Sequence, residues 1–263
     1  MKIKKTIIYK KNKKPFFTII TVVKNDEKNI ERTIKSIKNQ SFNNFEHIII
    51  DGLSSDKTVR NVLKNKKSID ILISEKDSGI YYAMNKGILL SRGKIIVFVN
   101  SGDLLKKNAL KIVFNKFKMN PNIDFVFGTV KRHYTKNTII KYGFNRKKLY
   151  YNFDFATAHS TGFYIKKESL KKIGKFNVNY KCSADYDIYY RAIIKNKMIG
   201  DFTSKHELIG EVKSGGFSSK VSFLDHLLEE SKIRIDNKQN IFFVTIIFLN
   251  SIIKYLLKKI KIN

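Results

Sequence analysis

The sequence predicts an α/β protein in which helices flank a mixed sheet. Short apolar runs alternate with segments whose apolar residues recur at helical spacing, a pattern typical of such a sheet. Hydrophobic residues make up 43% of the 263 residues, which is enough for a packed core. The two prolines and the absence of a Ser/Gly/Pro-rich stretch leave no obvious flexible linker. We therefore expect one compact domain with a C-terminal extension.

The first half of the chain alternates strand and helix in regular order. The apolar run "FFTIITVV" (16–23) predicts the first strand, and "NIERTIKSI" predicts a helix capped by Asn25 or Asp26. A second helix is expected to start at Ser54 or Ser55. The other elements expected here are strands over 47–51, 69–74 and 94–99 and a helix over 80–90.

The second half is less regular. The segment 123–130 is strand-like, 131–151 has no clear assignment, and "HSTGFYI" (159–165) predicts another strand. The segment "SADYDIYYRAIIKN" predicts a helix opened by Ser183, and a glycine loop over 214–218 precedes a helix from about 222 to 235. The strand ends of the first half are therefore the better-defined part of the prediction.

Basic residues dominate the charge balance, with 52 Lys and Arg against 22 Asp and Glu and a formal charge of +30. Such a charge attracts polyanions, but the lysines are spread along the whole chain, and no nucleic-acid-binding signature accompanies them. The single cysteine, Cys182, excludes an internal disulfide and fits a reducing compartment. The basic N-terminus lacks the apolar core of a signal peptide. We therefore expect a cytoplasmic location.

The common nucleotide-binding and catalytic motifs are missing. The sequence has no GxGxxG after its first strand and no GxxxxGK[ST], HExxH, paired CxxC or GxSxG motif. Carboxylates lie instead at the ends of predicted strands, and ligands of open α/β sheets bind beyond the carboxyl ends of the strands. In "VFVNSGDLL" (97–105), Asp103 suits a hard divalent cation, and Gly102 would let the backbone approach a ligand.

An ordered series of segments resembles the inverting family-two glycosyltransferases of the GT-A (Rossmann-like) fold, in their bacterial surface-polysaccharide subgroup. The segment that resembles the nucleotide-binding half of the family is "TIITVVKNDEKNIERTIKSIKNQSFNNFEHIIIDGLSSDKT". The metal-binding DxD element of the family corresponds to the end of "EKDSGIYYAMNKGILLSRGKIIVFVNSGDLL". The acceptor-side strand and the helix with the catalytic base resemble "AHSTGFYI" and "SADYDIYYR". The resemblance extends from about 16 to 234.

The resemblance implies a role for each matching residue. Asp103 would hold Mn²⁺ or Mg²⁺, and Asp185 would be the general base that takes a proton from the acceptor hydroxyl. The residues implied to bind the donor nucleotide are Thr21, Val23, Asn25, Asp51, Asp77, Tyr81, Asn85, Lys86 and Ser101. Weaker candidates for the acceptor side or a lid are His159, Arg191, Gly215 and Gly216.

Each acidic candidate also has a plain structural interpretation. Asp51 precedes a glycine and would suit a turn, Asp103 would suit the N-cap of a helix starting at Leu104, and Asp185 would suit the first turn of its own helix. Asp187 does not share a helical face with Asp185, so we interpret it as structural. One departure from the family pattern is that Gly102 stands where many relatives have a first acid, which leaves metal binding to Asp103 with help from His159.

The C-terminal segment 220–263 is expected to form a helical extension beyond a catalytic domain over 1–219. Residues 240–253 carry no charge but are shorter than the roughly 20 apolar residues of a membrane span. The following lysines, Lys254, Lys258, Lys259 and Lys261, suit a helix lying on anionic lipid at the inner face of the membrane. A helix packed on the domain explains the pattern nearly as well.

The sequence therefore predicts an enzyme that moves a sugar from a nucleotide sugar, UDP-sugar first, to a hydroxyl of a glycan acceptor, a lipid-linked one by expectation. Nucleic acid is not an expected partner. Three alternatives stay open at this point: a nucleotidyltransferase, a basic nucleic-acid-binding protein without catalysis, and a non-catalytic glycosyltransferase-like scaffold.

Overall fold

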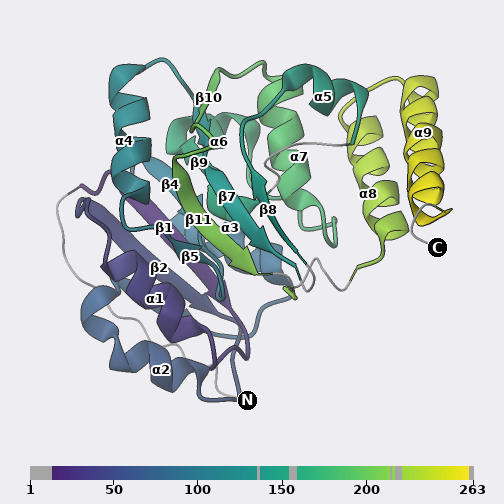
Figure 1. Cartoon of the computed structure of the whole chain (residues 1–263). Helices are drawn as coiled ribbons and strands as arrows, with labels where there is room; N and C mark the ends of the chain where they lie inside the picture. The colour runs from purple at the N-terminus through teal and green to yellow at the C-terminus, as the bar shows by residue number, and fades with distance from the viewer. Residues whose placement is uncertain (1–13, 135–136, 154–158, 214, 217–220, 261–263) are drawn as a thin grey trace.

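The chain folds around a seven-stranded mixed sheet with a smaller sheet lying against it (Figure 1). The structure is a computed structural model that describes residues 14–134, 137–153, 159–213, 215–216 and 221–260. The large sheet has the strand order β10-β6-β9-β4-β1-β2-β3. Its strands are β1 (Phe17–Val23), β2 (Phe45–Asp51), β3 (Ile71–Ser74), β4 (Ile95–Phe98), β6 (Phe125–Phe127), β9 (Phe163–Lys166) and β10 (Gly200–Phe202).

The strands β3, β2, β1 and β4 are parallel, so their carboxyl ends meet at one edge of the sheet. Val23 pairs with Asp51, and Asp51 pairs with Ser74. On the other side of β1, the amide of Ser101 donates to the carbonyl of Val22 (3.3 Å). Only β9 runs antiparallel to its neighbours β4 and β6. The edge that the sequence predicts for ligand binding is therefore formed by these parallel strands.

Alternation along β1 divides the core into two layers. Ile20 and Val22 pack with side chains of α3 (Ile80–Leu90), α6 (Lys167–Ile173) and α7 (Ala184–Tyr190). Phe17 and Ile19 face the opposite way, toward α4 (Ala109–Met119). On that same face, α1 (Ile30–Lys38) and α2 (Thr58–Lys64) pack over β2 and β3. Helices therefore cover both faces of the sheet, as predicted.

The smaller sheet has the order β5-β11-β7-β8 and packs between α1 and α4 (Figure 1). It consists of β5 (Leu104–Leu105), β11 (Leu208–Lys213), β7 (Thr129–His133) and β8 (Thr138–Lys141). The chain passes from the large sheet to the smaller one at Gly128, whose amide donates to the carbonyl of Gly162 (2.7 Å). Through β5 and β7, this sheet places the segment that follows Gly102 and the C-terminal end of β7 near the carboxyl edge of the large sheet.

Two helices, α8 (Phe223–Asp236) and α9 (Ile241–Ile260), end the chain and lie at the outer side of α7 and α5 (Arg146–Tyr151) (Figure 1). Arg234 of α8 is fully buried and donates to the main-chain carbonyls of Leu149, Tyr150 and Asn152. Its guanidinium also lies 4.4 Å from the centre of the Phe153 ring. These contacts attach α8 to the segment that contains α5. The predicted domain boundary at residue 219 stays a prediction.

Among the described residues, none of the helices has the length and apolar character needed to span a bilayer.

Several local predictions differ from the structure. The second helix begins at Thr58, because Ser54 bonds Asp51 and the amide of Ser55 donates to Asn25. The first helix is capped at Asn29, since the carbonyl of Asp26 accepts from the next turn.

The segment 159–165 also differs, because it begins as a 3-10 turn over Ser160–Gly162 before it enters β9. The alternative in which Asp103 caps a helix at Leu104 is wrong, because Leu104 starts the strand β5 and α4 begins only at Ala109. The helix over 80–90 is confirmed as α3.

Candidate functional site

Asp103 lies at the carboxyl edge of the sheet, in the turn between β4 and β5. Its carboxylate is 6% exposed and accepts one hydrogen bond, from the hydroxyl of Thr161 (2.6 Å). Of the described basic side chains, only that of His159 lies within 4 Å of it, with Nδ1 at 3.9 Å from Oδ2. Burial raises the pKa of Asp103 to about 7, against the opposing effects of the Thr161 hydrogen bond and the charge of Arg132.

His159 stands beside Asp103 as a neutral imidazole. Burial, and then the positive charge of Arg132, lower the pKa of His159 to about 3. Its Nδ1 accepts a weak hydrogen bond from the amide of Thr161 (3.3 Å). In this neutral ring the single lone pair is on Nδ1, where the Thr161 amide shares it, so a cation would have to displace that weak bond. The structure nevertheless brings together the two residues that the resemblance implied for a metal.

A metal fits this place only if the ligand supplies further oxygens. Among the described residues, no group of three or more His, Cys, Asp or Glu side chains could hold a metal ion. The carboxylate of Asp103 and the imidazole of His159 give two donors, and Mg²⁺ typically binds through one or two protein carboxylates plus substrate phosphates. The residues present therefore suit a divalent cation that arrives with a diphosphate.

Gly102 adopts a backbone conformation that explains the departure from the two-acid pattern. Its φ is +97°, a value that L residues rarely adopt. An aspartate at this position would be strained whatever space surrounds it. Ser101 is held in place by Asp26, whose carboxylate accepts from the Ser101 hydroxyl (2.6 Å). The turn thus brings the carboxylates of Asp26 and Asp103 to the strand end, and only Asp103 belongs to the residues of the predicted metal site.

Asp185 lies in the first turn of α7, where its carboxylate accepts from the amide of Tyr186 (2.9 Å). Burial raises the pKa of Asp185 to about 6, although hydrogen bonds and the charges of His226 and Arg132 act in the opposite direction. Asp185 and Ser160 line one small cavity of about 10 Å³, the space of a single water. A carboxyl with this pKa can exchange a proton near neutral pH.

The segment 159–161 joins the surroundings of Asp103 and Asp185. Thr161 bonds Asp103, while Ser160 lines the cavity of Asp185 and accepts a hydrogen bond from the Asn100 amide (3.3 Å). Arg132 of β7 lies close enough for its charge to lower the pKa values of both carboxyls. Asp103 and Asp185, the predicted metal ligand and the predicted base, therefore both lie near the turn 159–161 and near the guanidinium of Arg132.

Asp51 is held on the other side of β1. It is fully buried and accepts hydrogen bonds from the amide and hydroxyl of Ser54 (3.0 and 2.5 Å) and the hydroxyl of Ser74 (2.6 Å). Asn25, at φ +51°, joins the same loop through its amide, which donates to Ser54 Oγ (2.8 Å). This cluster shapes the loop after β2, and a contact of Asp51 or Asn25 with a nucleobase stays a prediction.

Thr21 and Val23 occupy the core rather than an open surface. Thr21 is fully buried, with its hydroxyl 2.9 Å from Nε2 of His47, whose pKa burial lowers to about 4. Val23 is 6% exposed and packs with Ile30 and Ile49. Their side chains shape the end of β1, which leaves their main chain as the part that a donor could reach.

Lys86, one of the residues predicted on α3, forms ion pairs within the chain. Lys86 pairs with Glu75 (2.5 Å) and Asp77 (2.6 Å), so its charge is already balanced by two carboxylates. Burial lowers the pKa of Lys86, but the hydrogen bonds and charges of these acids outweigh it and raise the pKa above its usual value. Lys86 thus holds the loop 75–79 to α3. The second oxygen of Asp77 is buried and has no hydrogen-bond partner among the described atoms.

Tyr81 and Asn85 turn toward Asp185 rather than toward the donor loops. The amide of Asn85 donates to the carbonyl of Phe176 (2.8 Å) and accepts from its amide (2.9 Å). Tyr81 stacks on the Phe176 ring, with centroids 5.5 Å apart, and its hydroxyl accepts from the amide of Ala184 (3.2 Å). Because Phe176 lines the cavity of Asp185, these contacts place Tyr81 and Asn85 beside that cavity, and their donor-binding role stays a prediction.

Arg191 is engaged by contacts within the chain, and its role on the acceptor side stays a prediction. Its guanidinium pairs with Asp187 (2.7 Å) and donates to the carbonyls of Ile173, Gly174 and Lys175 at the end of α6. Asp187 is 2% exposed, in agreement with its structural interpretation. Gly215 and Gly216 lie among residues of the predicted lid that are only partly described, since Ser214 and 217–218 fall outside the described residues, so the lid stays a prediction.

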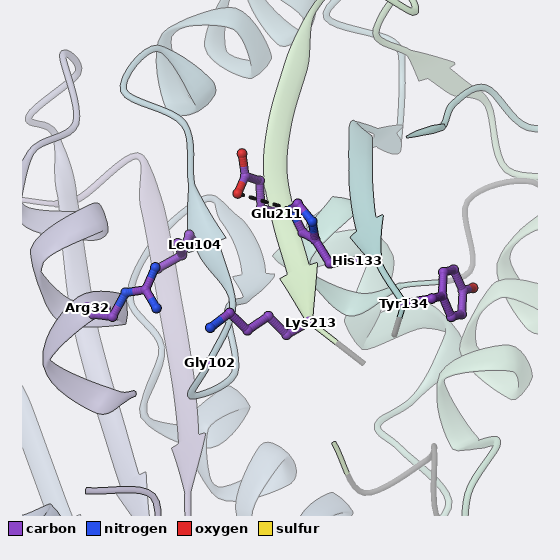
Figure 2. Close-up of a pocket in the computed structure, with 7 residues that line it drawn as sticks. All are labelled: Arg32, Gly102, Leu104, His133, Tyr134, Glu211 and Lys213. Atoms are coloured by element: carbon purple, nitrogen blue, oxygen red, sulfur yellow. Dashed lines mark hydrogen bonds and ion pairs between the residues drawn. The ribbon is translucent and has the colours of Figure 1, made fainter. Parts of the chain in front are cut away.

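A larger cavity of about 390 Å³ lies beside Gly102. Figure 2 shows Lys213 extending from the end of β11 toward the Gly102 turn, while Arg32 reaches from α1 on the other side. Glu211 on its wall is balanced by Lys106 (2.5 Å) and His133 (3.3 Å). The two cationic groups therefore face a space beside Gly102 and Leu104 in which an anion would be stabilised, while the side chain of Asp103 is not part of its lining.

Sequence reasoning missed four groups of this site: Arg32, Arg132, Thr161 and Lys213. Two of them had a usable signal, because Thr161 lies in the predicted acceptor strand and Lys213 precedes the predicted lid. Arg32 and Arg132 had none among 52 basic residues. Asp51 lies in the lining of neither cavity.

Comparison with known proteins finds glycosyltransferases. An uncharacterised glycosyltransferase of Methanocaldococcus jannaschii is 27% identical over 209 residues, which cover 74% of this chain and 71% of that protein. A PGL/p-HBAD biosynthesis glycosyltransferase of Mycobacterium bovis is 25% identical over 231 residues, which cover 84% of this chain and 87% of that protein.

Solved structures share the fold. A fragment of S. aureus TarS in complex with UDP-GlcNAc matches with a TM-score of 0.68 at 16% identity, over 88% of this chain and 70% of that chain. A mannosyltransferase of Pyrobaculum calidifontis in complex with GDP-Man and Mn²⁺ matches with a TM-score of 0.58 at 16% identity, over 89% and 66%. The chain spans 43% of the longer TarS chain.

The sheet and its flanking helices are those of a GT-A glycosyltransferase. The sequence profile of glycosyl transferase family 2 matches residues 18–174, more than half of the chain. The chain belongs to glycosyl transferase family 2.

Proposed function

We propose that this glycosyltransferase moves one sugar from a UDP-sugar to a hydroxyl of a lipid-linked glycan, in the synthesis of a bacterial surface polysaccharide. The observation that carries the proposal is that the turn holding the buried carboxyl of Asp103 also borders, through Gly102 and Leu104, a cavity that Arg32 and Lys213 line with positive charge. A diphosphate with its cation would satisfy both features at once. The UDP-GlcNAc complex of a structural neighbour supports the choice of the donor.

Asp185 is proposed as the general base. The acceptor O–H donates its proton to the Asp185 carboxylate while the acceptor oxygen forms a bond to the anomeric carbon of the donor. The bond from that carbon to the diphosphate oxygen breaks in the same step, and one direct displacement inverts the anomeric configuration. A positioned base contributes about 10²–10⁴-fold to such a reaction. Its pKa of about 6 leaves the carboxylate free to accept a proton at neutral pH.

The departing diphosphate gains negative charge, and the chain provides positive groups for it. Lys213 and Arg32 line the cavity next to Gly102, and their charges would stabilise the leaving oxygens. Asp103 and His159 would hold a Mn²⁺ or Mg²⁺ ion, which when bound supplies further positive charge to the diphosphate. The Mn²⁺ complex of a structural neighbour supports this choice of cation.

A thermal-shift screen tests the proposal. Because a ligand that binds only the folded state raises its apparent stability, UDP or a UDP-sugar with Mn²⁺ should raise the melting temperature. The increase should disappear in Asp103→Asn but remain in Asp201→Asn, a matched change on the distant strand β10. If no nucleotide raised the melting temperature while DNA or RNA bound in a salt-sensitive manner, the proposal would be wrong.

A further inference from the structure

The outer face of α9 exposes a continuous apolar stripe. Its large side chains recur at intervals of three and four residues, so they share one side of the helix. The exposed fractions are 78% for Phe242, 64% for Ile246, 54% for Leu249, 56% for Ile253, 51% for Leu256 and 53% for Leu257. Soluble monomers rarely expose an apolar patch of this extent without a partner.

The inner face of the same helix already has its packing partner. Val244 and Ile247 are 2% and 4% exposed, and α9 packs along α8. Packing on the body therefore explains only one side of an apolar helix. The outer stripe needs a second explanation.

The first turns of α8 also expose large apolar side chains. The rings of Phe223 and Tyr255 stack with centroids 4.3 Å apart, which places the start of α8 beside the end of α9. Leu224 and Leu228, one turn apart on α8, are 48% and 50% exposed. The apolar surface thus belongs to a pair of packed helices rather than to one protruding segment.

The positive charge of the chain favours an anionic lipid surface over a second copy of the chain as the partner of this stripe. The stripe itself has no charged residue from Ile241 to Ile253, whereas Lys254 is exposed at its basic end and the sequence continues with three more lysines at 258, 259 and 261. The chain carries a formal charge of +30, so two copies would repel each other as they approached. An anionic lipid surface offers the opposite charge and an apolar layer beneath it.

We propose that the outer face of α9, with the first turns of α8, docks onto an anionic lipid surface and leaves the catalytic body outside the bilayer. The apolar stripe enters the layer between headgroups and acyl chains, and the exposed Lys254 contacts the headgroups. This inference depends on α8 and α9 alone and does not require the proposed sugar transfer.

Docking at this place also fixes the catalytic helix relative to the surface. The carboxylate of Glu229, on α8, accepts from the amides of Lys181, Cys182 and Ser183 (2.5, 2.7 and 2.7 Å) in the loop that leads into α7. The ring of His226 lies 3.2 Å from the Ser183 hydroxyl. The helix pair that contacts lipid therefore also supports the helix that carries Asp185, as an acceptor held at a membrane would require.

A tryptophan reporter tests the proposal, because the chain has no tryptophan of its own. Phe242→Trp should show a blue shift of its emission with vesicles of phosphatidylglycerol and phosphatidylcholine. The shift should be much smaller with phosphatidylcholine alone, and salt should weaken the binding. Neither a donor nor a metal is present, so this result is separate from any failure of catalysis.

Paired variants test the face itself. Ile246→Asp with Leu249→Asp should weaken co-sedimentation with the anionic vesicles by at least about tenfold, since it places two charges in the docked stripe. Leu89→Asp with Met119→Asp makes the same change of charge at two apolar positions that are 69% and 83% exposed on α3 and α4, and it should leave binding close to that of the wild type.

Three outcomes would overturn the proposal. The first is equal binding by both double variants, and the second is no binding of the wild type to anionic vesicles. The third is a wild-type dimer by light scattering that the α9 double variant converts to a monomer, because a second copy would then cover the face. Circular dichroism of each variant shows whether it is folded.

Discussion

The carboxylates on the two sides of β1 differ in the hydrogen bonds and ion pairs that the chain gives them. On the donor side, Asp51 accepts three hydrogen bonds, and Asp77 pairs with Lys86. On the transfer side, Asp103 accepts one side-chain hydrogen bond among the described residues, from Thr161, and Asp185 accepts hydrogen bonds from main-chain amides only, Tyr186 among them. Burial accordingly raises the pKa values of Asp103 and Asp185 to about 7 and about 6.

This difference separates acids that maintain the fold from acids that are available for chemistry. A buried carboxylate costs free energy unless hydrogen bonds or a cation compensate for it. The donor side provides that compensation within the chain, whereas the transfer side leaves it to a proton, a cation or a substrate. The difference predicts opposite effects of the same substitution on the two sides.

The largest effect is expected on catalysis. Asp185→Asn removes the proposed base, so the rate of transfer at saturating donor should fall by about 10²–10⁴-fold. Donor affinity should change little, because the residue acts on the acceptor proton. Nucleotide release measured at several donor concentrations separates the two quantities. Asp201→Asn is the control, and a rate for Asp185→Asn equal to that of the control would remove Asp185 from the mechanism.

The next effect is on stability at the donor side. Asp51→Asn replaces an acceptor of three hydrogen bonds with an amide that can accept fewer, and buried donors left without a partner cost about 1–3 kcal/mol. Urea unfolding should show a decrease of that size in the free energy of unfolding. An unchanged midpoint would mean that Asp51 is not the structural acid that the comparison requires.

Asp103→Asn should change the free energy of unfolding in the opposite direction to Asp51→Asn. An unfolded aspartate has a pKa of about 3.9, whereas burial raises that of folded Asp103 to about 7. The protonated carboxyl therefore contributes stability that is complete below about pH 4 and is lost as the pH rises through about 7. The variant has no such loss, so its stability relative to the wild type should increase from pH 4 to pH 8.

Urea unfolding of both proteins across this pH range, without added metal, measures the difference. A stability of the variant relative to the wild type that stayed constant or fell between pH 4 and pH 8 would contradict the interpretation of Asp103.

A smaller effect is expected from Glu229, a positioning residue that does not touch the reacting groups. Glu229→Gln weakens its hold on the three amides before α7, so the rate should fall by about tenfold, the equivalent of one charge-assisted hydrogen bond. The pH profile of the rate should shift as well, because Asp185 would be placed less firmly. A lower stability with an unchanged rate and pH profile would show a purely structural role.

Local sequence patterns predicted α3, the four parallel strands and the placing of Asp51 and Asp103 near their carboxyl ends, because apolar runs and polar strand ends are local signals. The resemblance added Asp185. Contacts between distant segments could not be predicted in this way. Thr161 meets Asp103 across 58 residues and Tyr81 meets Ala184 across 103, and nothing in either neighbourhood marks the partner.

The same limit applies to the predicted residues of α3. The spacing of Tyr81, Asn85 and Lys86 places them on one helix but does not say which loop each side chain meets. The structure sends two of them to Phe176 and Ala184 and the third to Glu75 and Asp77. Arg132 and Arg32 were invisible for a different reason, since a chain with 52 basic residues offers no contrast by which to select them.

The central claim is that Asp103 is kept buried and uncompensated for a cation that arrives with a diphosphate. Calorimetric titration of Mn²⁺ into the protein with UDP at pH 8 tests it most directly, with Asp103→Asn and the control Asp201→Asn alongside. We expect the wild type and Asp201→Asn to bind, and Asp103→Asn to bind at least about tenfold more weakly. Equal binding by all three proteins would contradict the account.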